Sequence, residues 1–168
     1  WRKLRMFGLN RRWRVYRYAA GGIQSFAPHI DAGFPPSGLT DDGTDLMWDT
    51  SAPPSSSSTS DDNAEPTVVS RLTLLLYLND NFQGGETIFY PPLCTKDESD
   101  DHNSDDEPLV AVKPVTGAAL LFPQAVGEAA VAHARQYWPL HEGSPVQAGS
   151  AEAKYVIRSD VLFKDYIV

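Results

Sequence analysis

Residues 72–78 read Leu-Thr-Leu-Leu-Leu-Tyr-Leu, and this run is the clearest indication of how the chain folds. It has the length of a strand, and it lies between Arg71 on one side and Asn79 and Asp80 on the other. A continuous apolar run of this length between polar residues is typical of a buried strand. We therefore expect it to form a central strand of a sheet.

Seven further segments have strand character, and turn-forming residues separate them. They are residues 14–20, 26–31, 86–90, 109–112, 118–122, 139–146 and 154–163. Helical periodicity is absent, and residues 127–134 are the one candidate helical turn. Eight short strands without internal repeats predict a mainly β fold with few helices, a jelly roll in which two antiparallel sheets enclose an interior site.

A chain of 168 residues with 42% hydrophobic residues fits a single globular domain, which we place at residues 1–168. Residues 37–66 are rich in Ser, Asp and Pro, and residues 95–108 are strongly acidic, so we expect two polar loop inserts. The first insert is long enough to serve as a lid. The chain opens at Trp1 without a methionine or a signal region, which predicts a piece of a longer protein truncated at its N-terminus.

The net charge of −8 argues against a nucleic-acid partner, because nucleic-acid grooves need a basic surface. No segment approaches the ~18 apolar residues of a membrane span. Cys94 is the single cysteine, so an internal disulfide is impossible. We expect a small-molecule or peptide substrate instead.

His29 and Asp31 are the first candidate metal ligands. In a strand, side chains two residues apart point to the same face, so this imidazole and this carboxylate lie side by side. A remote imidazole would complete a 2-His-1-carboxylate triad, the set that binds Fe(II) and leaves positions open for substrate and O₂. His141 is the best candidate, since it starts a Gly- and Pro-containing block before a strand. His133 is its competitor in an alanine-rich stretch.

An oxygenase of this kind needs a reductant for O₂, and a 2-oxo acid is one that can chelate the metal. If that acid is 2-oxoglutarate, its far carboxylate needs a fixed cation and a hydroxyl partner. Lys154 and Arg158 lie on one face of the last strand, and Tyr77 can supply the hydroxyl. A cation that faces an apolar interior requires an anion beside it.

Six blocks of the sequence, taken together, resemble a known family. They are Tyr18 with residues 26–31 (FAPHID), residues 74–79 (LLLYLN), 84–87 (GGET), 117–122 (GAALLF), 141–146 (HEGSPV) and 154–158 (KYVIR). In this order they are similar to the catalytic domain of prolyl 4-hydroxylase-type 2-oxoglutarate/Fe(II) dioxygenases, over roughly residues 11–165.

The resemblance implies a double-stranded β-helix, the same jelly roll that the strand count predicts. It implies that His29, Asp31 and His141 bind Fe(II), and that ascorbate serves as the reductant that restores oxidised iron. Such an enzyme hydroxylates a C–H bond, possibly of peptidyl proline, and releases succinate and CO₂.

The resemblance also implies the 2-oxoglutarate site. Lys154 pairs with the far carboxylate, Tyr77 lies beside it, Tyr18 lines the pocket and Thr87 lies near the wall. The gap from His141 to Lys154 is about three residues longer than is usual in the family, and an odd shift of register would turn Lys154 outward. Arg158 is then the alternative anchor.

Two other functions stay open at this point. One is a catalytically inactive jelly-roll binding module. The other is a cupin-like metalloenzyme that does not use 2-oxoglutarate.

Overall fold

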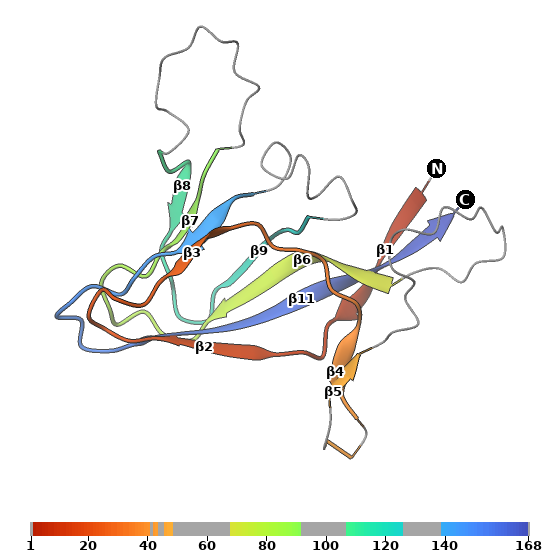
Figure 1. The fold of residues 1–168 in the computed structure, drawn as a ribbon, viewed down its shortest axis with the longest axis horizontal. Helices are drawn as coiled ribbons and strands as arrows, with labels where there is room; N and C mark the ends of the chain where they lie inside the picture. The colour runs from red at the N-terminus through yellow and green to blue at the C-terminus, as the bar shows by residue number, and fades with distance from the viewer. Residues whose placement is uncertain are drawn as a thin grey trace, which may run out of the picture.

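The computed structural model describes residues 2–40, 42–43, 46–48, 68–91, 107–125 and 139–167. These residues form eleven strands and contain no helix (Figure 1). The strands are β1 (Arg2–Leu9), β2 (Arg14–Tyr18), β3 (Phe26–His29), β4 (Ser37–Leu39), β5 (Leu46–Trp48), β6 (Val68–Tyr77), β7 (Thr87–Phe89), β8 (Val110–Val112), β9 (Ala119–Pro123), β10 (His141–Gly143) and β11 (Lys154–Ile167).

The larger sheet has the order β1-β11-β6-β9, and all of its pairs are antiparallel. The long strand β11 serves two partners along one edge. Its first half pairs with β2, from Lys154 opposite Tyr18 to Arg158 opposite Arg14, and its second half pairs with β1. Its other edge pairs with β6 along most of its length.

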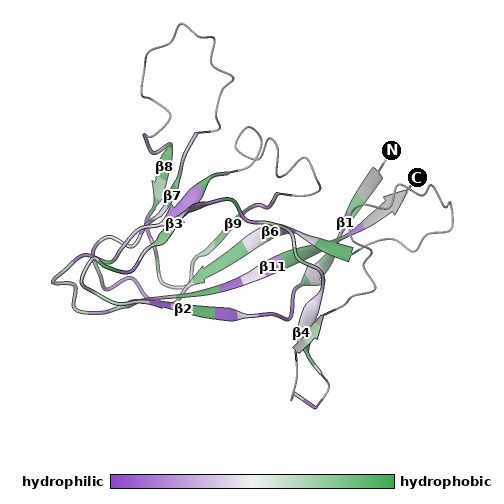
Figure 2. Ribbon diagram, viewed as in Figure 1, coloured by the Kyte–Doolittle hydropathy of each residue, from purple (hydrophilic) through white to green (hydrophobic). Residues whose placement is uncertain are grey.

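The smaller sheet has the order β3-β10-β7-β8, also antiparallel throughout. In Figure 1, β3, β7 and β8 lie over one end of the larger sheet, while β1 and the end of β11 extend away from them. Two facing antiparallel sheets confirm the predicted jelly roll. Figure 2 shows the apolar stretches of β6 and β9 that contribute to the core.

All eight predicted strands are present. The run at residues 72–78 lies in β6, which starts earlier, at Val68. Side chains of β6 and its neighbours fill the interior, among them Leu74, Tyr77, Phe122 and Val156.

The structure corrects the prediction for the first insert and does not describe most of the other irregular regions. Residues 37–66 are not simply a loop, because β4 and β5 pair as a small antiparallel hairpin within them. Residues 49–67, most of the second insert and the candidate helical turn at 127–134 lie outside the described residues. Within the described part of the chain, no helix is long and apolar enough to cross a membrane.

Strand β1 was not predicted. Its Leu4, Met6 and Phe7 are all exposed, so it lacks the alternation of a half-buried strand. Its extended form comes instead from backbone pairing with β11, interrupted by a register shift between Met6 and Gly8. Backbone pairing does not require an alternation of apolar and polar side chains, so the sequence gives no sign of this strand.

The turn before β7 brings the two halves of the site together. Gly84 forms an isolated bridge with Val146, and the Gly85 N–H donates to the Pro145 carbonyl at 3.0 Å. Both glycines have positive φ, 75° and 71°. A Cβ on Gly84 would lie 2.7 Å from the Pro145 oxygen, so the close approach of the two backbones requires a glycine.

We predict that Gly84→Ala destabilises the fold more than Gly117→Ala does. Both glycines have similar φ, 75° and 80°, but a Cβ on Gly117 meets nothing within 4 Å. Gly117→Ala should lower the free energy of unfolding by ~1–2 kcal/mol through backbone strain alone. Gly84→Ala should cost at least ~1 kcal/mol more because of the clash. Chemical denaturation measures both, and equal losses would contradict the packing described for this turn.

Candidate active site

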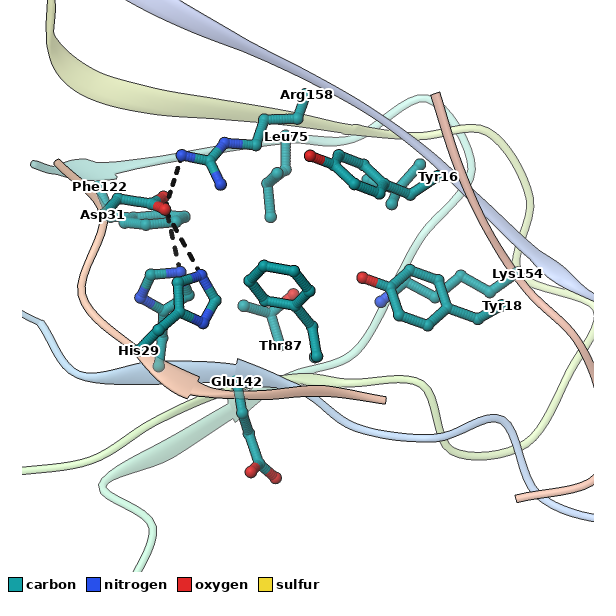
Figure 3. Close-up of a pocket in the computed structure, with 14 residues that line it drawn as sticks. Tyr16, Tyr18, His29, Asp31, Leu75, Thr87, Phe122, Glu142, Lys154 and Arg158 are labelled. Carbon is teal, nitrogen blue, oxygen red and sulfur yellow. Dashed lines mark ion pairs between the residues drawn. The ribbon is translucent and has the colours of Figure 1, made fainter. Parts of the chain in front are cut away.

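A pocket opens between the two sheets, with a volume of about 440 Å³ including its mouth (Figure 3). Six of the seven predicted site residues line it: Tyr18, His29, Asp31, His141, Lys154 and Arg158. The seventh, Tyr77, is 2% exposed and lies behind the wall, with its ring centroid 5.7 Å from the Lys154 Nζ. The structure therefore brings all seven to one place.

The two histidines are direct partners across neighbouring strands. His29 on β3 lies opposite His141 on β10, and their ring centroids are 4.3 Å apart. Asp31 follows β3 by two residues and is 4% exposed. Its Oδ1 lies 3.4 Å from the His29 Nε2 and its Oδ2 lies 3.6 Å from the His141 Nε2. One ligand atom from each of the three residues lies within 4.8 Å of the others.

A backbone carbonyl fixes the orientation of each imidazole ring. The His29 Nδ1 lies 2.8 Å from the Ala27 carbonyl, and the His141 Nδ1 lies 3.1 Å from the Pro139 carbonyl. A carbonyl oxygen only accepts hydrogen bonds, so each Nδ1 carries a proton and each Nε2 faces Asp31; a neutral ring of this kind is the Nδ1–H tautomer. Burial is the largest influence on His141 and lowers its pKa, which favours that neutral form.

Aromatic rings hold the imidazoles in these orientations. The Phe26 ring meets the His29 ring edge-to-face at 4.1 Å. The Phe122 ring meets the His141 ring in the same way at 4.5 Å, and Phe89 packs on Phe122. The imidazoles thus pack against apolar rings, and their two Nε2 atoms converge with the Asp31 carboxylate on one point.

Asp31 is held as an anion despite its burial. Burial on its own raises the pKa of Asp31, but the hydrogen bond from His29, the charge of Arg158 and the hydrogen bond from Thr73 together outweigh it and lower the pKa to about 2. The Arg158 Nη2 lies 2.6 Å from Oδ1, and the Thr73 hydroxyl donates to Oδ2 at 2.6 Å. The carboxylate is therefore ionised at any physiological pH.

Lys154 lies at the other end of the pocket and faces inward, with 2% of its surface exposed. Its Nζ donates to the Gly85 carbonyl at 2.7 Å and lies 4.8 Å from the centroid of the Tyr18 ring. Burial lowers the pKa of Lys154 to about 8, against an opposing effect of Glu86. Among the described residues, no carboxylate lies within ion-pair distance of it.

The longer gap between His141 and Lys154 does not turn Lys154 outward. Val146 remains bridged to Gly84, and Ser150 donates its N–H to the Gln147 carbonyl in a turn. The chain then enters β11 with Lys154 opposite Tyr18 and its side chain buried.

Arg158 lies on the same face of β11 as Lys154 but at the histidine end of the pocket (Figure 3). Four residues of a strand span ~13 Å, so the two cations mark opposite ends of the pocket wall. Arg158 already has an anionic partner in Asp31. Lys154, by contrast, donates to a neutral backbone carbonyl, and the described residues offer it no ionic partner.

The sequence matches the family model described as the 2OG-Fe(II) oxygenase superfamily over residues 13–159. The chain belongs to this superfamily. The match includes all seven predicted site residues. A comparison with curated proteins finds no match.

Membership implies Fe(II) as the metal and 2-oxoglutarate as the cosubstrate, and the oxygenase has suitable donors for both. Two imidazole nitrogens and one carboxylate are the set that non-haem Fe(II) oxygenases use. The partners on each Nδ1 are the outer hydrogen bonds that usually orient histidine ligands. A buried lysine that has no ionic partner in the described part of the chain fits a ligand that brings its own carboxylate.

Several residues of the oxygenase site were not predicted. Thr73 lies on the same face of β6 as Tyr77, and Tyr16 on the same face of β2 as Tyr18, so the period of two along a strand could have identified both. Gln124, which contacts Thr73, comes directly after β9 and carries no comparable signal. His133, the competitor of His141, lies outside the described residues, so the structure does not compare the two.

Proposed function

We propose that this oxygenase is an Fe(II)- and 2-oxoglutarate-dependent dioxygenase of the prolyl 4-hydroxylase type that hydroxylates a C–H bond. Peptidyl proline is the first substrate to test, and a small molecule is the second. The observation that carries the proposal is the pairing of the His29, Asp31 and His141 cluster with a buried, inward-facing Lys154 in one pocket. Ascorbate would keep the iron reduced.

The metal, with 2-oxoglutarate and O₂, supplies the oxidation: one oxygen atom ends in succinate as CO₂ leaves, and the other ends in the hydroxyl group of the product. His29, Asp31 and His141 would hold the iron through two Nε2 atoms and a carboxylate oxygen. The ionised Asp31 offsets part of the charge of the cation, and the buried rings of Phe89 and Phe122 shield His141 from water.

Lys154 would pair with the far carboxylate of 2-oxoglutarate. Only one of the three N–H bonds of its ammonium group is donated to the Gly85 carbonyl. The Tyr77 hydroxyl lies 2.8 Å from the Thr87 hydroxyl, and burial raises the pKa of Tyr77, so the phenol stays neutral. Burial also raises the pKa of Tyr18. Neutral phenols beside a cation can share a carboxylate with it without repelling it.

The wall near the histidines suits an apolar C–H group. Phe26, whose ring packs on His29, and Leu75, which pairs with Arg158 across the sheet, line the pocket there. An apolar lining with few polar groups is the usual form of a site that orients an organic substrate. Such a lining is compatible with a proline ring, and it supports a hydroxylation better than chemistry on a charged group.

We predict that the chain releases succinate from 2-oxoglutarate when it is supplied with Fe(II), ascorbate and O₂. Proline-rich peptides and small molecules are screened for the compound that increases succinate in step with its own hydroxylation. His141→Ala should abolish turnover, because it removes one of three metal ligands. Arg17→Ala, on the exposed outer face of β2, is the matched control and should leave turnover unchanged.

Two results would contradict this prediction in different ways. If iron binds but no succinate forms with any substrate, even uncoupled, the chain is an inactive binding module. If iron binds under anaerobic conditions and added 2-oxoglutarate produces no visible charge-transfer band, the protein is a cupin-like metalloenzyme that does not use 2-oxoglutarate.

We predict that Lys154→Ala weakens 2-oxoglutarate binding by ~100-fold or more at saturating metal, because breaking a buried charge pair costs several kcal/mol. Affinity should also fall as the pH rises through the pKa of Lys154, about 8 in the empty pocket, because only the protonated amine pairs with a carboxylate. Lys154→Arg should remove that pH dependence, since a guanidinium group stays charged. Calorimetry across pH measures all three effects. A larger loss in Arg158→Ala than in Lys154→Ala would make Arg158 the anchor.

A further inference from the structure

Behind Asp31, on the side away from the pocket, lies a group of fully buried polar side chains. Ser70, Thr73, Gln124 and Asp160 are each 0% exposed, and none of them lines the pocket. They come from β6, from the residue after β9 and from β11. Hydrogen bonds join them into one chain that ends on Asp31.

The amide of Gln124 is oriented from both of its ends. Its Oε1 accepts from the Ser70 hydroxyl at 2.6 Å, and the Ser70 oxygen in turn accepts from the Phe34 N–H at 2.7 Å. Its Nε2 donates to an Asp160 carboxylate oxygen at 2.7 Å. A carboxylate accepts only, so this contact requires the amide nitrogen on that side, and the amide oxygen then faces the Ser70 hydroxyl.

The orientation of this amide determines where the Thr73 proton points. The second N–H of the Gln124 amide donates to the Thr73 hydroxyl oxygen at 3.0 Å. That oxygen is thereby used as an acceptor, and its one proton is directed to the Asp31 Oδ2 at 2.6 Å. The opposite oxygen of Asp31 receives Arg158, so the carboxylate is held from two directions.

Asp160 holds the other end of the chain. The Arg14 Nη2 lies 3.2 Å and 3.4 Å from its two carboxylate oxygens. This ion pair provides a partner for a carboxylate that is otherwise enclosed. Burying polar groups in this way costs desolvation free energy, and well-packed apolar residues of similar volume often give equal stability. A role in orienting Asp31 accounts for their presence better than a role in stability.

We infer that Thr73, Gln124 and Asp160 are positioning residues that form a relay: they fix the direction of the Thr73 hydroxyl and, through it, the orientation of the Asp31 carboxylate toward the metal. The inference rests on the proposed metal centre. Outer hydrogen-bond partners of ligating carboxylates commonly contribute ~10–100-fold to metal affinity.

The direct test compares Thr73→Val with Thr73→Ser. Valine keeps the shape of the side chain and removes the hydroxyl, while serine keeps the hydroxyl. Anaerobic titration with Co(II), followed through its visible absorption, gives the metal affinity without any turnover. Thr73→Val should bind Co(II) ~10–100-fold more weakly, with a changed spectrum, and Thr73→Ser should bind like the unaltered chain.

The remote test compares Gln124→Leu with Ser159→Ala. Gln124→Leu leaves Thr73 in place but frees its proton to turn away from Asp31, so Co(II) affinity should fall although residue 124 does not line the pocket. Ser159 is also 0% exposed, and its hydroxyl donates to the Asn10 carbonyl, away from the relay. Ser159→Ala thus loses a buried hydrogen bond without affecting the metal affinity. Thermal unfolding of each metal-free variant separates lost stability from lost binding.

Unchanged Co(II) affinity in Thr73→Val would overturn the relay while leaving the proposed function intact. Equal losses of affinity in Gln124→Leu and Ser159→Ala would also overturn it, because the effect would then follow stability alone. If Gln124→Leu does not fold, the comparison of Thr73→Val with Thr73→Ser decides whether the relay exists. Failure of the unaltered chain to bind Co(II) or Fe(II) would instead overturn the metal centre itself, and the relay with it.

Discussion

The carboxylate of Asp31 is the constraint on which the rest of the site depends. A charged group that is 4% exposed must be compensated within the fold, and here a guanidinium, a hydroxyl and two imidazoles face it. Their arrangement requires β3, β6, β10 and β11 to meet at one place. The jelly roll achieves this by stacking a small sheet over one end of a larger one. The stacking of the two sheets therefore both forms the fold and assembles the site.

The charges in the pocket divide it into two ends. Arg158 and Asp31 neutralise one another beside the histidines. Lys154, on the same strand, donates to a neutral carbonyl and lies near the rings of Tyr18 and Tyr77. Burial makes the ammonium form of Lys154 less favourable and lowers its pKa to about 8. The proposed cosubstrate would relieve that imbalance with its far carboxylate at one end while it meets the metal at the other. This asymmetry supports Lys154 over Arg158 as the anchor.

The sequence predicted the strands and site residues that are marked by a pattern within a short stretch of the chain. The apolar run at residues 72–78, the turn residues and the pair His29 and Asp31 predicted the eight strands and the ligand face. It could not predict β1 or the β4–β5 hairpin, which are held by pairing rather than by alternation. The direction of Lys154 depended on a turn of unknown length, and the pairing of Arg158 with Asp31 depended on how the sheets stack. Gln124 could not be found for the same reason.

The central claim is that one pocket holds a metal at the histidines and 2-oxoglutarate between that metal and Lys154. A crystal structure of the chain grown anaerobically with Fe(II) and 2-oxoglutarate tests it most directly. The account predicts a metal bound by the Nε2 atoms of His29 and His141 and by Asp31, with the far carboxylate of 2-oxoglutarate at the Lys154 Nζ. A metal bound elsewhere, or a far carboxylate held by Arg158 while Lys154 keeps only the Gly85 carbonyl, would contradict it.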